Sequence, residues 1–148
     1  MIIYAQEKLI DTLGEIIPAA KEASLAIYKS ADFVQPRYAV YLMVEHAGNL
    51  RLFTARLNGE LVGYCAVIVD TSIHKESEIL ATSSSFYIRK DSSDILRALK
   101  FFRYIKQQLK NEGVNEWALT TTTDVDISPL FKRLGAELYE TVHRLKLG

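Results

Sequence analysis

The stretch from Ala81 to Val114 constrains the fold more than any other part of this 148-residue chain. Its first part, Ser83 to Ile88, is rich in strand-forming residues, and the following segment, Arg89 to Asp94, is wholly polar. Apolar residues then recur at helical spacing, which predicts a long helix from about Ser93 to Glu112. Because a strand is predicted again at Trp117 to Thr121, the stretch indicates a strand–loop–helix–strand unit. Such a unit aims the free N–H groups of its helix start at whatever binds beyond the first strand.

The dipeptide Asn58-Gly59 is the strongest turn signal in the sequence. It separates a segment of alternating residues, Leu50 to Leu57, from a long segment that ends at Asp70. The apolar run within this second segment, Leu61 to Val69, is typical of a strand buried on both faces. We therefore expect a hairpin of two long strands before the unit described above.

The remaining patterns place helices and strands around this centre. We expect the first helix to break near Gly14 to Pro18, because glycine and proline both interrupt helices. The other expected elements are a strand at Met1 to Tyr4, helices at Gln6 to Tyr28, Arg37 to His46 and Asp126 to Leu134, a strand at Ile79 to Ile88, and a closing strand at Glu137 to Leu147. The predicted fold class is α/β, with a mixed, mostly antiparallel central sheet flanked by helices on both faces. We expect residues 1–148 to form a single domain.

Composition excludes several classes of function. Eighteen basic residues balance eighteen acidic ones, so bulk charge does not favour nucleic acid as a partner. The single cysteine, Cys65, lies in an apolar run and indicates a buried thiol, with neither a disulfide nor a metal cluster. No apolar run approaches the roughly 18 residues that a membrane span needs. We expect a cytoplasmic protein, or one carried inside a virion if it is phage-encoded.

Several motifs resemble those of one protein superfamily. The central unit, with "EGV" before its last strand, looks like the central motif of the Gcn5-related N-acetyltransferases (GNAT). GELVGYCAVIV, from Gly59 to Val69, resembles their strand pair, and SPLFKRLGAELYE, from Ser128 to Glu140, resembles their C-terminal motif. LGEIIPAAKEA, from Leu13 to Ala23, resembles the first helix of a branch common in bacteriophages. The resemblance covers nearly the whole chain and implies the GNAT fold.

The resemblance also implies a cofactor, acetyl-CoA, whose acetyl group passes to an amine. In the family, the backbone at the end of the central strand pairs with the pantetheine arm. The matching residues here are Phe86, Tyr87 and Ile88. Since this contact uses the main chain, it places no demand on side-chain type.

The family binds the pyrophosphate with a loop rich in arginine and glycine at the start of the following helix. The positions that match this loop hold Ser93, Asp94, Ile95, Leu96, Arg97 and Ala98. Of these, Ala98 fits the family pattern well, and Arg97 could reach a phosphate. The missing glycines would leave side chains where backbone N–H groups should close on phosphate. Asp94 adds a carboxylate near a polyanion, and Ser93 or Asp94 could cap the helix instead.

The catalytic positions also depart from the family. The family tyrosine, which protonates the leaving thiolate, is matched by Phe131, and phenylalanine has no proton to give. Glu15 matches a glutamate of the phage-type branch. His74 lies where that branch often has a His-Tyr pair, and histidine has a suitable pKa for a base. His74 and Glu15 are therefore the candidate catalytic residues.

Two functions remain open from the sequence. The first is a GNAT-type N-acetyltransferase with weak or lost activity, whose partner would be a small amine or a protein amine. The alternative is a non-catalytic protein of the same fold, a pseudoenzyme that binds another protein or itself, such as an internal virion component or a binder of a host protein. Neither function requires a metal.

Overall fold

The computed structural model describes residues 1–27, 36–89, 95–121, 123 and 126–148. These residues form one sheet of five strands in the order β1-β2-β3-β4-β5. The strands are β1 (Ile2–Glu7), β2 (Leu50–Leu57), β3 (Glu60–Thr71), β4 (Ile79–Ile88) and β5 (Glu116–Ala118). All neighbours run antiparallel except β4 and β5, which run parallel. The predicted mixed, mostly antiparallel sheet is confirmed.

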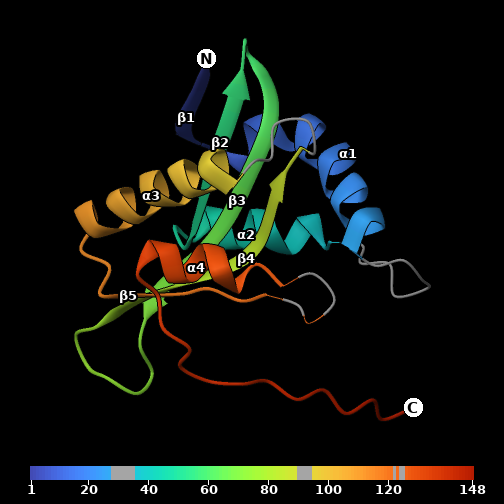
Figure 1. Ribbon diagram of the computed structural model, residues 1–148. Helices are drawn as coiled ribbons and strands as arrows, with labels where there is room; N and C mark the ends of the chain where they lie inside the picture. Colours follow the sequence, from blue (N-terminus) through green and yellow to red (C-terminus); the bar gives the residue numbers. More distant parts are fainter. Residues whose placement is uncertain (28–35, 90–94, 122, 124–125) are drawn as a thin grey trace.

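Helices cover both faces of this sheet (Figure 1). The four helices of the described chain are α1 (Leu9–Ile27), α2 (Tyr38–His46), α3 (Ile95–Asn111) and α4 (Ser128–Leu134). On one face, apolar residues of α1 and α2 pack against side chains of β2, β3 and β4. On the other face, α3 packs against the sheet, and α4 packs against α3. Within the described residues, no helix has the length and apolar character needed to cross a bilayer.

The hairpin between β2 and β3 follows directly from its sequence. Asn58 and Gly59 both have positive φ angles, 51° and 86°, as the tightest hairpin turns require. The predicted bounds of β2 are confirmed, and β3 ends at Thr71, one residue after the predicted Asp70. Residues 61–67 of β3 are all buried, because helices lie over both faces of this strand.

Helix α1 runs without a break through Gly14 and Pro18, so the predicted interruption is wrong. Proline at position 18 cannot donate a hydrogen bond to the carbonyl of residue 14, and its ring crowds that carbonyl. Both residues are exposed. Water can therefore hydrate the freed carbonyl, and the buried side of the helix holds the two halves together.

A side chain from α2 completes the start of α1. The carboxylate of Glu45 accepts hydrogen bonds from the backbone N–H groups of Leu9, at 2.5 Å, and Ile10, at 3.1 Å. These donors have no partner inside the helix, and the negative charge also opposes the positive end of the helix dipole. The contact fixes the relative positions of α1 and α2, which together form one layer.

The expected closing strand at Glu137–Leu147 is wrong. Residues 136–148 have no regular secondary structure, and residues 137–148 are exposed. In Figure 1 this segment leaves α4 and runs past the lower side of the sheet to the C-terminus. An alternating sequence supplies only a preference for strand, and a strand also needs a partner for its hydrogen bonds. No strand of the described chain pairs with this segment.

Candidate functional site

Strands β4 and β5 separate after a short paired region, and the gap between them is called here the fork. The two strands pair at three positions, which join Leu80 to Glu116, Ala81 to Trp117, and Thr82 to Ala118. Beyond Thr82, β4 continues to Ile88 with β3 on one side and no strand of the described chain on the other. Six residues of β4, 83–88, therefore have no strand of the described chain beside them on the side where β5 has ended, and this side is called here the fork edge of β4.

A β-bulge explains why β4 leaves β5 at this point. Ala66 of β3 lies opposite Ser85, but its neighbour Val67 lies opposite Ser83, so Ser84 is an extra residue in β4. A bulge bends its strand and increases its twist. The bend comes two residues after Thr82, the last position at which β4 pairs with β5.

Aromatic side chains fill the base of the fork. The ring of Phe102 on α3 lies 4.6 Å from Phe86, 5.7 Å from Trp117 and 5.9 Å from Phe131, measured between centroids. The indole N–H of Trp117 donates a hydrogen bond of 2.8 Å to the hydroxyl of Ser83. This contact ties the two strands together where they begin to separate.

On the opposite face of the sheet, β4 contacts both α1 and α2. The hydroxyl of Tyr87 donates a hydrogen bond of 2.9 Å to Oε2 of Glu22 on α1. The hydroxyl of Tyr41, on α2, also forms a hydrogen bond with the hydroxyl of Ser84. Glu22 thus brings a carboxylate to the part of β4 that carries the fork edge, and Ser84 and Tyr41 bring hydroxyls.

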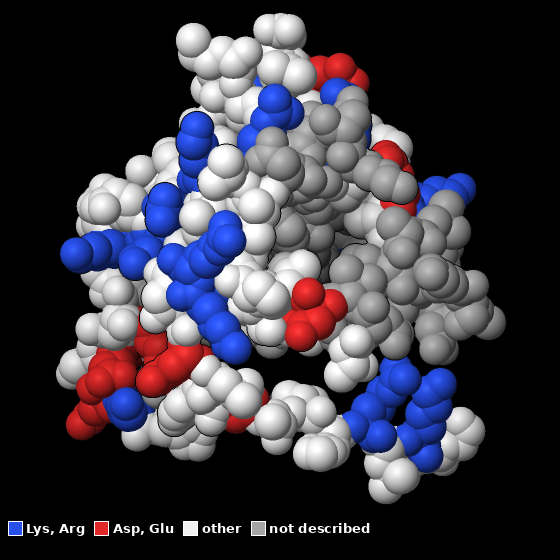
Figure 2. Space-filling model, in the orientation of Figure 1, with Lys and Arg blue, Asp and Glu red and all other residues white. Residues whose placement is uncertain are grey.

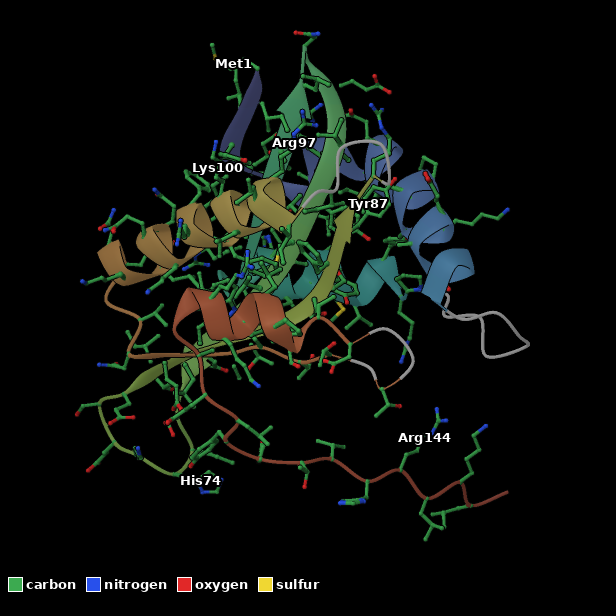
Figure 3. The ribbon with its side chains drawn as sticks, in the orientation of Figure 1. Met1, His74, Tyr87, Arg97, Lys100 and Arg144 are labelled. Atoms are coloured by element: carbon green, nitrogen blue, oxygen red, sulfur yellow. The ribbon has the colours of Figure 1, made fainter. Side chains whose placement is uncertain are left out.

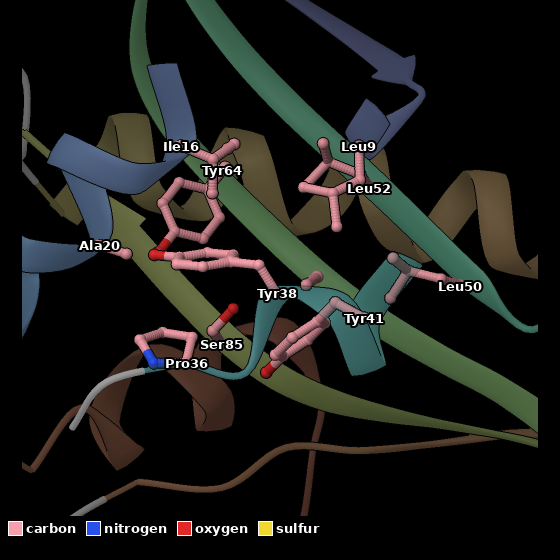
Figure 4. A pocket seen from close by; sticks show the side chains of 11 residues that line it. Leu9, Ile16, Ala20, Pro36, Tyr38, Tyr41, Leu50, Leu52, Tyr64 and Ser85 are labelled. Atoms are coloured by element: carbon pink, nitrogen blue, oxygen red, sulfur yellow. The ribbon is translucent and has the colours of Figure 1, made fainter. Parts of the chain in front are cut away.

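A small apolar cavity of about 30 Å³ lies beside these contacts (Figure 4). Its lining comes mainly from α1, α2 and the strands β2 to β4, and it includes no charged residue. Burial raises the pKa of Tyr38 and of Tyr64, two of its tyrosines. Both phenols are therefore neutral at physiological pH and act as hydrogen-bonding groups rather than bases.

The start of α3 carries most of the residues predicted for phosphate binding. Ile95, Leu96 and Arg97 are exposed in the first turn, and Ala98 is half-buried. Arg97 also lines a cavity of about 10 Å³ with residues of β1 to β4 and α3. Figure 2 shows basic side chains along α3, and Figure 3 labels two of them, Arg97 and Lys100. The predicted positions Ser93 and Asp94 lie outside the described residues.

Glu15 lies in an ion pair with Arg56. Its two carboxylate oxygens accept hydrogen bonds from Arg56 at 2.8 and 2.9 Å, and Arg56 also binds Glu7 at 2.9 and 3.0 Å. The hydrogen bonds from Arg56 lower the pKa of the Glu15 carboxyl, against the opposing effect of burial. A lowered pKa makes the carboxylate a weaker acceptor of protons, so the ion pair makes Glu15 a weaker base. The sequence did not reveal that Arg56 is the partner of Glu15.

His74 lies in the loop between β3 and β4 and is exposed. Its backbone N–H donates to the hydroxyl of Ser72, at 3.1 Å. Figure 3 shows His74 at the lower end of the molecule, whereas Tyr87 and Arg97 lie near its upper end. The structure therefore does not bring His74 together with the residues at the end of β4.

Three residues of this site were missed by sequence reasoning. Glu22 and Trp117 reach β4 through contacts across 65 and 34 residues of sequence, and no local pattern encodes such contacts. Ser84 is the extra residue of a bulge, and the sequence signal is weak because Ser83, Ser84 and Ser85 are identical. Within the described residues, no group of three His, Cys, Asp or Glu side chains could hold a metal ion.

Comparison with solved structures identifies the architecture. The chain superposes with a TM-score of 0.79 on a ribosomal-protein-alanine N-acetyltransferase from Brucella melitensis biovar Abortus 2308, at 13% identity, with 100% of this chain and 99% of that chain covered. It superposes with a TM-score of 0.74 on an aminoglycoside acetyltransferase from an uncultured soil metagenomic sample, at 16% identity, covering 99% and 97%. A predicted acetyltransferase from Clostridium acetobutylicum, solved with acetyl-CoA, gives a TM-score of 0.74 at 12% identity, covering 100% and 96%.

Sequence comparison adds nothing to these likenesses, because no protein-family model and no curated protein matches the chain. At such low identities, the superpositions establish the fold and leave the activity open. The GNAT fold that the sequence motifs implied is confirmed over essentially the full chain. The chain therefore shares its architecture with proteins that transfer acetyl groups.

Proposed function

We propose that this protein is a GNAT-fold N-acetyltransferase that binds acetyl-CoA along the fork edge of β4 and acetylates an amine at a low rate. The observation that carries the proposal is the fork edge, along which residues 83–88 have no strand of the described chain beside them. An exposed row of N–H and C=O groups can take another extended chain, and the pantetheine arm has amide groups of its own. The solved neighbour with acetyl-CoA supports this cofactor.

The residues present fit the two ends of such a cofactor. Phe86, Tyr87 and Ile88 would pair through their backbone with the pantetheine amides. Arg97, in the first turn of α3, would place its guanidinium near the pyrophosphate, where the positive helix end also favours an anion. Ile95, Leu96 and Ala98 would border the phosphate without contributing charge. When bound, acetyl-CoA supplies a thioester that an amine can attack.

Glu22 is our candidate for the group that takes the proton from the amine. In the reaction, the amine nitrogen forms a bond to the thioester carbonyl carbon, the C–S bond breaks, and the amine loses a proton. Among the described acidic residues of α1, Glu22 is the one with a hydrogen bond to β4. His74 and Glu15 remain the other candidate bases. An amine acceptor would approach from the side of α1 and α2, where Tyr41 and Ser84 offer hydroxyls.

A low rate follows from the leaving-group side of the site. Phe131, buried against Phe102, occupies the place of the family tyrosine and cannot protonate the departing thiolate. A positioned general acid contributes typically about 10²- to 10⁴-fold to a rate. We therefore expect the remaining acceleration to come mainly from positioning.

A second candidate is a non-catalytic protein that uses the fork or the start of α3 to bind a partner. The observation in its favour is the exposure of Ile95 and Leu96, where the family has a glycine-rich loop. Two neighbouring apolar side chains at a helix start suit a protein partner better than a phosphate. The tests below separate the two candidates.

The first test follows backbone amide signals by NMR during titration with millimolar acetyl-CoA. We expect shifts at residues 83–88, which line the fork edge of β4, and little change at β1 and β2, which lie at the other side of the sheet. Desulfo-CoA serves as a control for nucleotide binding without the thioester. An absence of shifts at millimolar ligand, or shifts confined to β1 and β2, would contradict acetyl-CoA binding at the fork.

The second test compares Glu22→Gln with Glu15→Gln and His74→Ala, using thiol release with a panel of amines. If Glu22 is the base, its variant loses about 10²-fold or more of the rate, whereas the other two retain theirs. Each variant removes one candidate base. The two glutamine variants also keep the size of the original glutamate side chain. Loss of activity in His74→Ala or Glu15→Gln alone would assign the base to that residue and reject Glu22.

The third test measures thermal unfolding with and without millimolar acetyl-CoA. We expect a small shift for the natural chain and a larger one for Ser93→Arg/Asp94→Gly, which removes a carboxylate near the helix start. A ligand at about 100 times its dissociation constant contributes about 2.7 kcal/mol, or several degrees for this size. A shift of several degrees in the natural chain, lost in Arg97→Ala, would instead show an intact pyrophosphate site.

A further inference from the structure

The outer face of α3 and α4 carries positive charge and no acidic residue. Seven of the eighteen basic residues of the chain lie in these two helices, so eleven basic residues remain elsewhere against all eighteen acidic ones. Figure 2 shows the basic side chains gathered over α3 and beside α4. Six of the seven lie beyond the first turn of α3, are exposed, and are called here the basic face. They are Lys100, Arg103, Lys106, Lys110, Lys132 and Arg133.

The packing of the two helices brings these side chains together. The four cations of α3 recur at intervals of three or four residues, so they lie on one side of the helix. Helix α4 packs against α3, and Nζ of Lys106 donates a hydrogen bond of 3.3 Å to the carbonyl of Leu134. The cations of α3 alone extend from Lys100 to Lys110, about 15 Å along the helix.

The basic face is not neutralised within the described chain. The ion pairs between described side chains use other cations, namely Arg51, Arg56, Lys75 and Arg89. One acidic side chain, Asp126, interacts with this face. Hydrogen bonds from Ser128 lower the pKa of its carboxyl, and the charge of Lys132 lowers it further. Most of the positive charge therefore remains available to a partner.

This arrangement has a cost for α3. Like charges three or four residues apart repel one another and destabilise a helix, whereas opposite charges at these spacings stabilise it. The exposed residues of α1 include both signs, with Asp11, Glu15, Lys21 and Glu22. Helix α3 has no acidic residue that could offset the repulsion. An anion bound to the basic face would relieve it.

The other exposed side chains of this face indicate the chemistry of the anion. Between Lys100 and Lys110, every exposed side chain is basic except the amide of Gln107. Protein interfaces usually have apolar or aromatic anchors and few lysines at their centre, and helices that bind membranes also insert apolar side chains. The phosphate backbone of a nucleic acid is bound through charge without such anchors. The guanidinium groups of Arg103 and Arg133 can also bind two phosphate oxygens at once.

We propose that the basic face binds the phosphate backbone of a nucleic acid. Its length of about 15 Å is comparable with four phosphates of one strand, which follow each other at about 3.4 Å along a duplex. The balanced total charge did not indicate this partner, because it averages the basic face with the acidic remainder of the chain. The proposal does not depend on acetyl transfer.

The first experiment measures fluorescence polarisation of labelled oligonucleotides of about 16 nucleotides, without acetyl-CoA. The probes are single-stranded RNA, single-stranded DNA and duplex DNA of mixed sequence. We expect micromolar dissociation constants at 0.1 M salt. The logarithm of the association constant should fall with the logarithm of salt concentration with a slope of about −3 to −5, as four to six phosphate contacts require. The ratio of affinities shows whether RNA or DNA is the preferred source of these phosphates.

The second experiment removes two charges at a time from the basic face. The variants are Arg103→Gln/Lys110→Gln on α3 and Lys132→Gln/Arg133→Gln on α4. Each should weaken binding at 0.1 M salt about 10-fold or more and bring the salt slope closer to zero by about 1.5, because two phosphate contacts are lost. Lys106 is left in place because it also contacts Leu134.

A matched control removes the same charge from the other side of the sheet. Lys8 and Lys21 are exposed before and within α1, and Lys8→Gln/Lys21→Gln should change the affinity less than about twofold. Thermal unfolding checks that all three double variants remain folded. Equal weakening by the control and by the variants of the basic face would show a general effect of net charge and would overturn the proposal.

Two further probes separate the nucleic acid from other polyanions. Polyglutamate of the same total charge should bind at least about 10-fold more weakly than the oligonucleotides, and vesicles with phosphatidylserine should not sediment the protein. Equal binding of polyglutamate would assign the face to an acidic protein, and sedimentation with vesicles would assign it to a lipid surface. A natural chain that does not saturate any oligonucleotide at 100 µM protein in 0.1 M salt would also overturn the proposal.

Discussion

The two ends of the sheet are held together in different ways. Where β1, β2 and the hairpin meet, Arg56 binds Glu7 and Glu15 with four hydrogen bonds of 2.8 to 3.0 Å. At the other side, β4 and β5 share three paired positions and then separate. We call the first region, with Arg56 and its two carboxylates, the closed end of the sheet, and the fork between β4 and β5 the open end. Ion pairs stabilise the closed end, whereas the short parallel contact at the open end leaves room for a ligand beside β4.

The largest expected effect concerns the aromatic side chains at the base of the fork. Phe102→Ala removes a side chain that is 2% exposed and contacts three other rings, so it should lower the free energy of unfolding by about 3–5 kcal/mol. Urea unfolding measures the change. Phe53→Ala, at a fully buried site elsewhere in the core, is the matched control with a similar loss. In the absence of urea, Phe102→Ala alone should disturb the amide signals of residues 83–88, and equal disturbance by both would remove the contrast between the two ends.

The closed end is tested by Arg56→Met, which keeps much of the side-chain length but removes the charge. Two carboxylates are then left close together without their cation, and we expect a loss of about 1–3 kcal/mol in the free energy of unfolding. Part of this network faces solvent, which places the value below that of a fully buried pair. Acetyl-CoA titrations of this variant should match those of the natural chain, and a changed affinity would show that the two ends are coupled.

Acid should weaken the closed end in the natural chain. Hydrogen bonds from Arg56 lower the pKa of the Glu7 and Glu15 carboxyls in the folded state. A carboxyl with a lowered folded pKa stabilises the protein above its unfolded pKa, about 4.3, and this stabilisation is lost as the pH falls through the folded value. The stability difference between the natural chain and Arg56→Met should therefore shrink below about pH 4. Urea unfolding at pH 3 to 7 measures it, and a constant difference would reject the ionic explanation.

The smallest expected effect concerns the contact at the base of the fork. Ser83→Ala removes the acceptor of the Trp117 indole N–H, and a lost hydrogen bond of this kind costs about 1 kcal/mol. A double-mutant cycle with Trp117→Phe isolates the pair, because each single change removes the same bond. A coupling near zero would mean that the aromatic contacts alone hold β5 in place.

The sequence predicted elements that depend on local signals. The β2–β3 hairpin was predicted because Asn58 and Gly59 adopt the positive φ angles that their side chains favour. Helix α3 was predicted because its apolar stripe is regular, and the structure buries Leu99, Phe102, Ile105 and Leu109 from that stripe. The GNAT architecture followed from the order of such elements together with the motifs.

The errors arose where distant parts of the chain decide the outcome. The break predicted in α1 ignored that Gly14 and Pro18 both face solvent, while the opposite side of the helix is packed. The closing strand at Glu137–Leu147 was predicted from alternation alone, without a partner strand. In the candidate site, Glu22 and Trp117 were missed because their contacts to β4 arise only in the folded chain. The catalytic roles of His74 and Glu15 stay predictions.

The parallel contact between β4 and β5 also has a consequence for the order of folding. Strands β2, β3 and β4 follow one another as antiparallel neighbours, so their pairing closes short loops. Strand β5 reaches β4 only after the chain has crossed over through α3, so it pairs Glu116 with Leu80 across 36 residues. Pairing over a longer separation costs more chain entropy and is slower. We expect the amides of β5 to gain protection from hydrogen exchange last during refolding. The antiparallel strands β2 to β4 would then form before β5 pairs with β4 and completes the fork.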